Sequence, residues 1–307
     1  MDYNTIGIDV SKNNLDLCIL PSRTYKSTSN DIDGYKRLLE YIKQFKRVRV
    51  LVESTGCYHK NLETYLRQSG IEIYVLNPKQ VRDYAKSCGK LAKTDRIDSY
   101  VIARYGETHE LIEKSINSDT HETFRMLVER RRQMVNMRRQ ERSYLEKYKT
   151  LNNTNIISKI ETAIMFYDNQ ILAIDKEIQE LLSCFEALSD TYQNLTQVQG
   201  VGASTAYDLM SDMPELGHMS SREVAALAGV APMNCDSGGM RGQRHIVGGR
   251  FIVRQALYMS CLSGIRYNPV IKAYYNRLKN ELHKPFKVAM VACMRKMIIH
   301  LNKVCAK

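Results

Sequence analysis

Four carboxylates in the first hundred residues have the residue types and the spacing of a divalent-cation site. Asp9 lies inside an apolar run that predicts a buried strand, and Glu53 ends a second run of this kind. Asp95 and Asp98 stand three residues apart in a segment with helical character, so both carboxylates lie on one helical face. Mg²⁺ prefers such oxygen ligands, and Mn²⁺ also accepts them. Two such ions can hold the attacking and leaving oxygens of a phosphodiester displacement.

Each acid also has an ordinary interpretation, because carboxylates at strand ends and on helices are commonly solvated or ion-paired. Asp9 is the exception, since a carboxylate within an apolar strand costs several kcal/mol unless it is paired or ligated. The order and setting of the four acids together favour a metal site over four unrelated charges.

A second group of reactive side chains lies in a glycine-rich loop of the C-terminal half. Ser237 precedes two glycines and is therefore sterically open. Arg241, Arg244 and Arg250 could neutralise a phosphate and stabilise a pentacoordinate transition state. A nucleophilic serine needs a base or a metal, and His245 is the only local base. The alternative is a flexible phosphate-binding glycine loop with an incidental serine.

The elements that would position the acids form an α/β domain over residues 1–115. Two apolar runs joined by a tight turn, 6–10 and 15–20, predict a β-hairpin. Later strands alternate with helical segments. A hairpin first and strand–helix–strand crossovers later predict a mixed sheet.

Residues 116–188 change character, because neither glycine nor proline occurs between 117 and 186. Apolar residues repeat at alternating steps of three and four from Ile157 to Leu181, which is the pattern of a coiled-coil seam. The preceding helical stretch carries several arginines, among them Arg131 and Arg138. We interpret the segment as an antiparallel helical hairpin that serves dimerisation and holds a phosphate backbone. A plain interdomain strut with a solvated arginine face is the alternative.

Residues 189–307 predict a third, mostly α-helical domain. Gly200 and Gly202 form a turn between helical stretches that resembles a helix-hairpin-helix turn, in which backbone N–H groups approach a phosphate. A tight turn between two helices is an equally good interpretation. Arg254, on the helix after the glycine loop, is a further phosphate-binding candidate.

The charge distribution indicates where a polyanion would bind. The formal net charge is +12, and from Ser237 to the C-terminus 14 lysines and arginines accompany a single acid, Glu281. The same stretch is rich in periodic apolar residues, which favours a folded domain over disorder. A basic surface that faces nucleic acid is therefore favoured over one that faces a membrane.

The eight cysteines are scattered singly, which disfavours a zinc site or a disulfide framework and fits a reducing cytoplasm. The sequence contains no run of 18 apolar residues, and its first residues lack the features of a signal peptide. We therefore expect a cytoplasmic protein without membrane association.

In combination, these motifs resemble the DEDD-type insertion-sequence transposases, the bridge-RNA-guided serine recombinases to which pilin-gene invertases also belong. The most specific stretches are 93–98, which reads Lys-Thr-Asp-Arg-Ile-Asp, and 231–239, which ends in Ser-Gly-Gly. The resemblance covers essentially the whole chain. Ser99 is a small departure, because an alanine often follows the second aspartate.

The resemblance implies a resolvase-type, RNase H-like N-terminal domain whose four acids bind Mg²⁺. It implies that Ser237 attacks the DNA backbone and forms a covalent phosphoserine link. The acids and the serine would come from different subunits of a tetramer made of two dimers. A guide RNA would select double-stranded donor and target DNA by base pairing, inside a prokaryotic cell.

Two other functions fit parts of the pattern. A metal-dependent nuclease or Holliday junction resolvase would use the four acids and water, with no covalent step. A non-catalytic nucleic-acid scaffold would use the carboxylates structurally. Neither explains the Ser-Gly-Gly-x-Arg context of Ser237.

Overall fold

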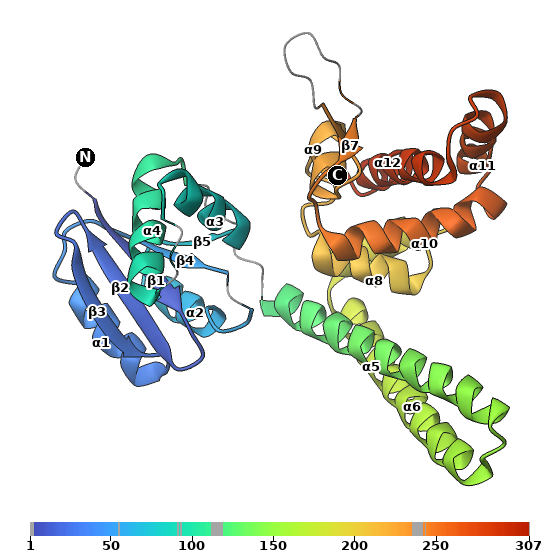
Figure 1. The fold of residues 1–307 in the computed structure, drawn as a ribbon, viewed down its shortest axis with the longest axis horizontal. Helices are drawn as coiled ribbons and strands as arrows, with labels where there is room; N and C mark the ends of the chain where they lie inside the picture. The colour runs from blue at the N-terminus through green and yellow to red at the C-terminus, as the bar shows by residue number, and fades with distance from the viewer. Residues whose placement is uncertain are drawn as a thin grey trace. The chain divides into compact units, whose positions relative to one another are not determined.

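A computed structural model of the chain describes residues 3–54, 56–90, 92, 94–111, 119–234, 242 and 244–306. The chain divides into two compact units, Met1–Ile116 and Asn117–Lys307, each with its own fold (Figure 1). In the described ranges no helix is both long enough and apolar enough to cross a membrane.

The N-terminal unit contains a five-stranded mixed sheet with the strand order β3-β2-β1-β4-β5. The strands are β1 (Asn4–Val10), β2 (Asn14–Leu20), β3 (Thr24–Ser29), β4 (Val48–Glu53) and β5 (Ile73–Leu76). The first three pair antiparallel, while β4 pairs parallel to both β1 and β5. This arrangement confirms the predicted mixed sheet. Strand β3 was not predicted, because this edge strand is polar and lacks an apolar alternation.

Helices cover both faces of the sheet (Figure 1). They are α1 (Ile32–Ile42), α2 (Lys60–Gln68), α3 (Pro78–Ser87) and α4 (Asp95–Thr108). Apolar side chains of α1 and α2 pack with Ile6 and Ile8 of β1 on one face. Those of α3 and α4 pack with Leu51 and Leu76 on the other face. Alternate residues of each strand therefore point to different helix layers.

A glycine in β1 allows α4 to lie directly on the sheet. A Cβ atom added to Gly7 would stand 2.3 Å from both the backbone nitrogen of Ala103 and the carbonyl oxygen of Ser99. One added to Gly106 would stand 3.2 Å from the side chain of Thr5. Because the later part of α4 lies over the earlier part of β1, the helix runs antiparallel to the strand.

The second unit begins with a hairpin of two long helices, α5 (Asp119–Thr150) and α6 (Thr154–Cys184), which pack along each other (Figure 1). The turn between them is short. Asn152 adopts a φ of 52°, and the side chain of Asn153 accepts a hydrogen bond from the backbone nitrogen of Ile156. These are the usual roles of asparagine at a helix junction.

The remaining chain folds around the base of this hairpin. Its elements are α7 (Glu186–Thr196), α8 (Ala203–Asp212), α9 (Ser221–Leu227), β6 (Pro232–Met233), β7 (His245–Ile246), α10 (Phe251–Tyr267), α11 (Pro269–Asn276), a π-helical turn (Arg277–Glu281) and α12 (Phe286–Val304). One apolar core connects the hairpin residues Phe124 and Ile178 with Tyr207 of α8 and Met297 of α12. Where the sequence predicted a plain loop, strands β6 and β7 pair as a short antiparallel ribbon.

Substitution of Gly7 tests the close packing of α4 on β1. We expect Gly7→Ala to lower the free energy of unfolding by about 2 kcal/mol, because both atoms that the new methyl group meets belong to the helix backbone. Urea unfolding of the full chain, followed by far-UV circular dichroism, measures this loss. Gly202→Ala is the control, since no neighbouring atom lies within 4 Å of its added Cβ. Equal midpoints of urea unfolding for the two variants would contradict this close packing.

Candidate functional site

Two of the predicted catalytic acids lie side by side at the end of the sheet. The parallel register of β1 and β4 ends in the pair Ile8 and Val52. Asp9 and Glu53 are the next residue of each strand. They therefore occupy neighbouring positions at the carboxyl ends of two adjacent parallel strands, and both side chains are half-buried.

Both acids point toward the α4 side of the sheet. A Cβ atom added to Gly7 would meet the backbone of α4, and one added to Gly106 of α4 would meet the Leu51 side chain. Gly7 and Leu51 therefore both contact α4. Side chains two residues apart on a strand share a face. Asp9 and Glu53, each two residues further on, consequently face the layer of α4.

The direction of α4 brings the other two acids to the same end. Ser99 and Ala103 lie over Gly7, so the first turn of the helix extends toward Asp9. Asp95 and Asp98 are both in that turn, where Thr94 caps the helix by accepting a hydrogen bond from the backbone nitrogen of Ile97. The positive end of the helix dipole favours carboxylates at these positions.

The first-turn acids differ in exposure. Asp95 is exposed, whereas Asp98 is half-buried and its Oδ2 atom is fully buried. Asp98 thus faces the sheet while Asp95 remains open to a ligand.

A fifth acid, Asp16, joins this group although its spacing in the sequence did not predict it. In the antiparallel register of β1 and β2, Asp16 lies directly opposite Asp9. Directly opposite residues have side chains on the same face, with Cβ atoms about 5 Å apart. Only the register reveals this neighbour, although a half-buried aspartate between Leu15 and Leu17 was the available signal.

The donor set suits a hard divalent cation, because every candidate ligand is a carboxylate on one face at one end of the sheet. The side chains do not close into a ligand shell on their own. Among the residues that the structure describes, no three His, Cys, Asp or Glu side chains lie close enough together to hold a metal ion. Any ion there would need further oxygen ligands.

Ser237 and Arg241 lie outside the described residues. In the sequence they stand between β6 and β7, so the predicted serine loop connects the two strands of the ribbon. Arg244 directly precedes β7 and is exposed.

The base of this loop is held by two glycines in close contact. Gly229 and Gly249 have φ angles of 71° and 75°, and a Cβ atom on Gly249 would stand 2.2 Å from Gly229 Cα. Only glycine satisfies both the left-handed backbone and this distance. Arg254 donates a hydrogen bond of 2.6 Å from Nη1 to the carbonyl oxygen of Gly248.

Arg250, predicted to bind phosphate, is an anchor in the structure. Its two terminal nitrogens each lie 2.6 Å from a carboxylate oxygen of Glu215, and Nη1 also donates to the carbonyl oxygen of Asp212 at 2.8 Å. This bidentate pair joins the start of α10 to the segment after α8. Its phosphate-binding role remains a prediction.

The two hairpin arginines also have protein partners. Arg131 pairs with Asp175 at 2.6 Å, and Arg138 pairs with Asp168 at 2.5 Å. Both pairs bridge α5 and α6, so they stabilise the hairpin, and binding of a phosphate by these arginines remains a prediction. Charged pairs thus occupy part of the contact between α5 and α6.

A third arginine fixes the hairpin to α8. Arg132 contacts Asp208 at 2.9 Å and Asp212 at 2.5 Å. Burial raises the pKa of the Asp208 carboxyl above its ordinary value, against the lowering effect of Arg132. The pair is therefore largely removed from water, and loss of either partner would leave a costly buried charge.

The two glycines of the Gly200 turn differ in their surroundings: Gly200 is packed against the protein, whereas Gly202 faces open space. Gly200 has a φ of 103°, and its added Cβ would stand 2.9 Å from the carbonyl oxygen of Ser260. Gly202 caps α8 and is exposed, with no atom within 4 Å of its added Cβ. The first turn of α8 is therefore accessible to a phosphate, as the helix-hairpin-helix interpretation requires.

Comparison with known families decides the class of the protein. A DEDD-type IS110 transposase model matches residues 6–154, and the model of the IS116/IS110/IS902 transposase family matches residues 192–276. Together they cover about three quarters of the chain. The chain belongs to the IS110 family of transposases. This IS110-type transposase is thus a DNA-binding enzyme of transposition and recombination, and DEDD transposases typically depend on divalent metals.

The family matches contain the predicted sites. All four acids lie within the first matched segment, and Ser237, its arginines and the Gly200 turn lie within the second. This IS110-type transposase is also 26% identical to the pilin gene-inverting proteins of Moraxella bovis and Moraxella lacunata. Each alignment spans 97% of this chain and 94% of the relative.

Removal of the Arg250 guanidinium tests the anchor. We expect Arg250→Ala to lower the free energy of unfolding by about 1 kcal/mol, since both partners are more than a third exposed and solvent screens the pair. The melting temperature should fall by roughly 2–4 °C. Arg139→Ala, at an exposed position of α5, is the control.

A conservative variant tests whether the bidentate pair with Glu215, and not positive charge alone, stabilises the protein. Arg250→Lys retains the charge but lacks the planar fork. If Arg250 is an anchor, the lysine variant melts like the alanine variant. Wild-type stability in both variants would show that the pair with Glu215 contributes nothing.

Proposed function

We propose that this transposase cuts and exchanges DNA strands through a phosphoserine intermediate formed by Ser237. Mg²⁺, or Mn²⁺ in its place, would be held by Asp9, Glu53, Asp95 and Asp98. A guide RNA would choose the donor and target DNA. The proposal rests on the family membership and on the resemblance described above.

One observation carries the metal-dependent part. The four acids come from β1, β4 and the first turn of α4, and the fold brings all of them to one face at one end of the sheet. The mixed sheet, with a hairpin first and crossovers later, supports an RNase H-like classification of the N-terminal domain. Asp16, opposite Asp9, adds negative charge that favours a cation at this end.

The serine step conserves the number of phosphoester bonds. The Ser237 oxygen forms a bond to the scissile phosphorus, the bond from phosphorus to the 3′ oxygen breaks, and a 3′-hydroxyl leaves with a proton. A 3′-hydroxyl of the exchanged strand then attacks the phosphoserine and releases the serine. No nucleotide cofactor is needed, and the sequence contains no Gly-x₄-Gly-Lys motif.

The basic residues near the loop would stabilise this reaction. Arg241 and Arg244 would neutralise charge on the transferred phosphate. Arg250 and Arg254 would hold the base of the loop, consistent with their contacts to Glu215 and Gly248. A bound divalent ion would supply Lewis acidity toward the phosphate oxygens and assist loss of the serine proton.

The helical hairpin would serve assembly as a coiled-coil arm. The proposed active unit is a tetramer of two dimers in which one subunit supplies the acids and another supplies Ser237. Both Moraxella relatives are named for gene inversion. This name supports recombination between paired DNA sites as the reaction class for this chain.

The serine is tested by trapping its DNA adduct. The protein is expressed with its native flanking DNA, denatured and assayed for covalently attached DNA. We expect an adduct with the wild type and with the control Ser183→Ala, and none with Ser237→Ala. DNA cleavage without any adduct in either protein would instead favour a metal-dependent nuclease or Holliday junction resolvase that uses only the acids.

The acids are tested by charge removal. We expect Asp95→Asn and Asp98→Asn each to abolish strand cleavage while leaving RNA binding intact, because each change removes a negative charge from the proposed metal site and keeps the size of the side chain. Asp33→Asn, in the first turn of α1 and 71% exposed, is the matched control. Cleavage by both site variants at the wild-type rate would refute the metal role.

A further inference from the structure

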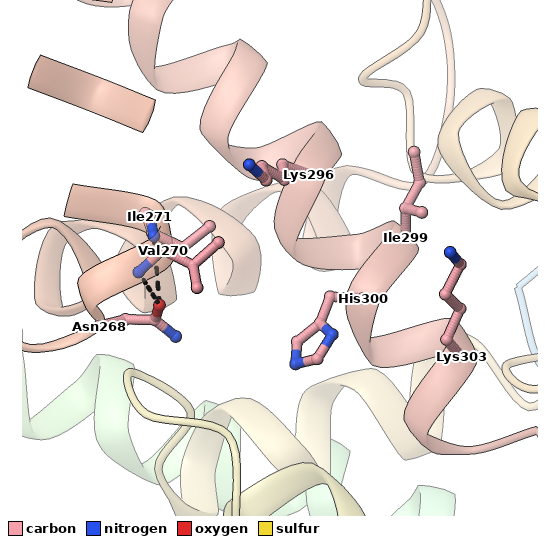
Figure 2. Close-up of a pocket in the computed structure, with 7 residues that line it drawn as sticks. All are labelled: Asn268, Val270, Ile271, Lys296, Ile299, His300 and Lys303. Atoms are coloured by element: carbon pink, nitrogen blue, oxygen red, sulfur yellow. Dashed lines mark hydrogen bonds between the residues drawn. The ribbon is translucent and has the colours of Figure 1, made fainter. Parts of the chain in front are cut away.

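A cavity of about 300 Å³ lies between the N-terminal end of α11 and one face of α12 (Figure 2). Three aliphatic side chains line it: Val270 and Ile271 of α11 and Ile299 of α12. Its volume lies at the lower end of the range for small-ligand sites. The cavity therefore offers an apolar surface for one flat ring system.

Cationic and ionisable side chains surround this apolar surface. Lys296, His300 and Lys303 follow one another along one face of α12, and all three are exposed. Lys296 Nζ stands 4.6 Å from the ring centroid of Tyr274. Among the residues that the structure describes, no acid lines the cavity, and in the sequence Glu281 is the only acid from residue 237 to the C-terminus. The ligand that fits combines an apolar ring with negative charge.

The cavity is connected to the Gly200 turn. Asn268 accepts hydrogen bonds from the backbone nitrogens of Val270 and Ile271 through Oδ1, and its Nδ2 donates to the carbonyl oxygen of Gln199 at 3.1 Å. Gln199 directly precedes Gly200. One asparagine thus fixes the cavity wall beside the exposed N-terminus of α8, where a phosphate can bind.

We propose that this cavity binds one unpaired nucleotide of a nucleic-acid strand. The base enters between α11 and α12, and its flanking phosphates contact Lys296, Lys303 and the first turn of α8. A base can leave its neighbours readily where the strand is unpaired, and proteins that take a base out of its stack hold it between aromatic or apolar side chains. A duplex alone would need the lysines but not the aliphatic surface.

This inference rests on the proposed function and names a nucleic-acid contact distinct from the serine loop. Residues 286–304, which form α12, lie outside both segments matched by the transposase models. The α12 wall of the cavity therefore lies beyond the matched segments, while its α11 wall, with Val270 and Ile271, lies within the second one. Single-stranded RNA and single-stranded DNA share the required chemistry, and the experiment separates them.

Two matched valines provide the test. Val270 and Val288 are 58% and 53% exposed, each lies in the first turn of its helix, and only Val270 lines the cavity. Val270→Glu and Val288→Glu therefore change the net charge equally. Binding of the full chain to labelled single-stranded RNA, single-stranded DNA and blunt duplex DNA of one sequence is measured by fluorescence anisotropy.

We expect Val270→Glu to weaken binding to a single strand about tenfold, and Val288→Glu to weaken it less than about twofold. The two variants should bind the duplex alike. The larger loss on RNA or on DNA identifies the natural strand. Lys303→Ala should reduce the slope of log K against log salt by about one, whereas Lys176→Ala, on the hairpin, should not.

Equal single-strand affinities of Val270→Glu and Val288→Glu would overturn the proposal, as would equal losses on single strand and duplex. Melting temperatures of the two variants exclude unfolding as the cause. The serine adduct is measured separately in the wild type. Loss of that adduct alone would reject the serine chemistry, while equal valine variants with an intact adduct would reject only the cavity.

Discussion

The close packing of α4 on β1 at Gly7 determines where the candidate catalytic acids lie. The added Cβ distances of 2.3 Å show that the helix backbone rests on the strand with no room for a side chain. This contact determines how closely α4 approaches the sheet and in which direction the helix runs. Because the helix runs antiparallel to β1, its capped first turn returns to the end of the strand where Asp9 lies. Any residue larger than glycine would separate the helix-borne acids from the strand-borne ones.

The second unit relies on charged pairs where the first relies on close packing. Arg132 joins the hairpin to α8, and Arg250 joins α10 to the chain after α8. Arg132 contacts the side-chain carboxylate of Asp212, and Arg250 donates a hydrogen bond to the backbone carbonyl oxygen of Asp212. The hairpin and the base of the serine loop are therefore attached to the same end of one helix, on a shared apolar core.

The positive charge of the chain serves two different purposes. Arg131, Arg132, Arg138 and Arg250 have carboxylate partners and contribute to the fold. Lys296 and Lys303 of α12 are exposed and line an apolar cavity. Arginine suits the internal pairs because its planar fork bonds a carboxylate bidentately, whereas lysine is a flexible point charge. The positive charges of Arg131, Arg132 and Arg138 on α5 are therefore balanced by neighbouring carboxylates, whereas the lysines beside the cavity have no acid among the described residues that line it.

From the sequence alone most helices and strands, the mixed sheet, the helical hairpin and the family resemblance could be predicted, because apolar periodicity, turn residues and short motifs are local signals. The polar strand β3 and the short β6–β7 ribbon could not be predicted, because they lack such a signal. It identified Asp9, Glu53, Asp95 and Asp98 as a set without their geometry. Only the tertiary structure decided their shared face, because that depends on register and helix direction. The same holds for Asp16, which becomes a neighbour of Asp9 only through strand pairing. The arginines show most clearly what the sequence does not contain. It gives their charge but not their partners. The carboxylates that pair with Arg131 and Arg138 lie 44 and 30 residues away, and the one that pairs with Arg250 lies 35 residues away.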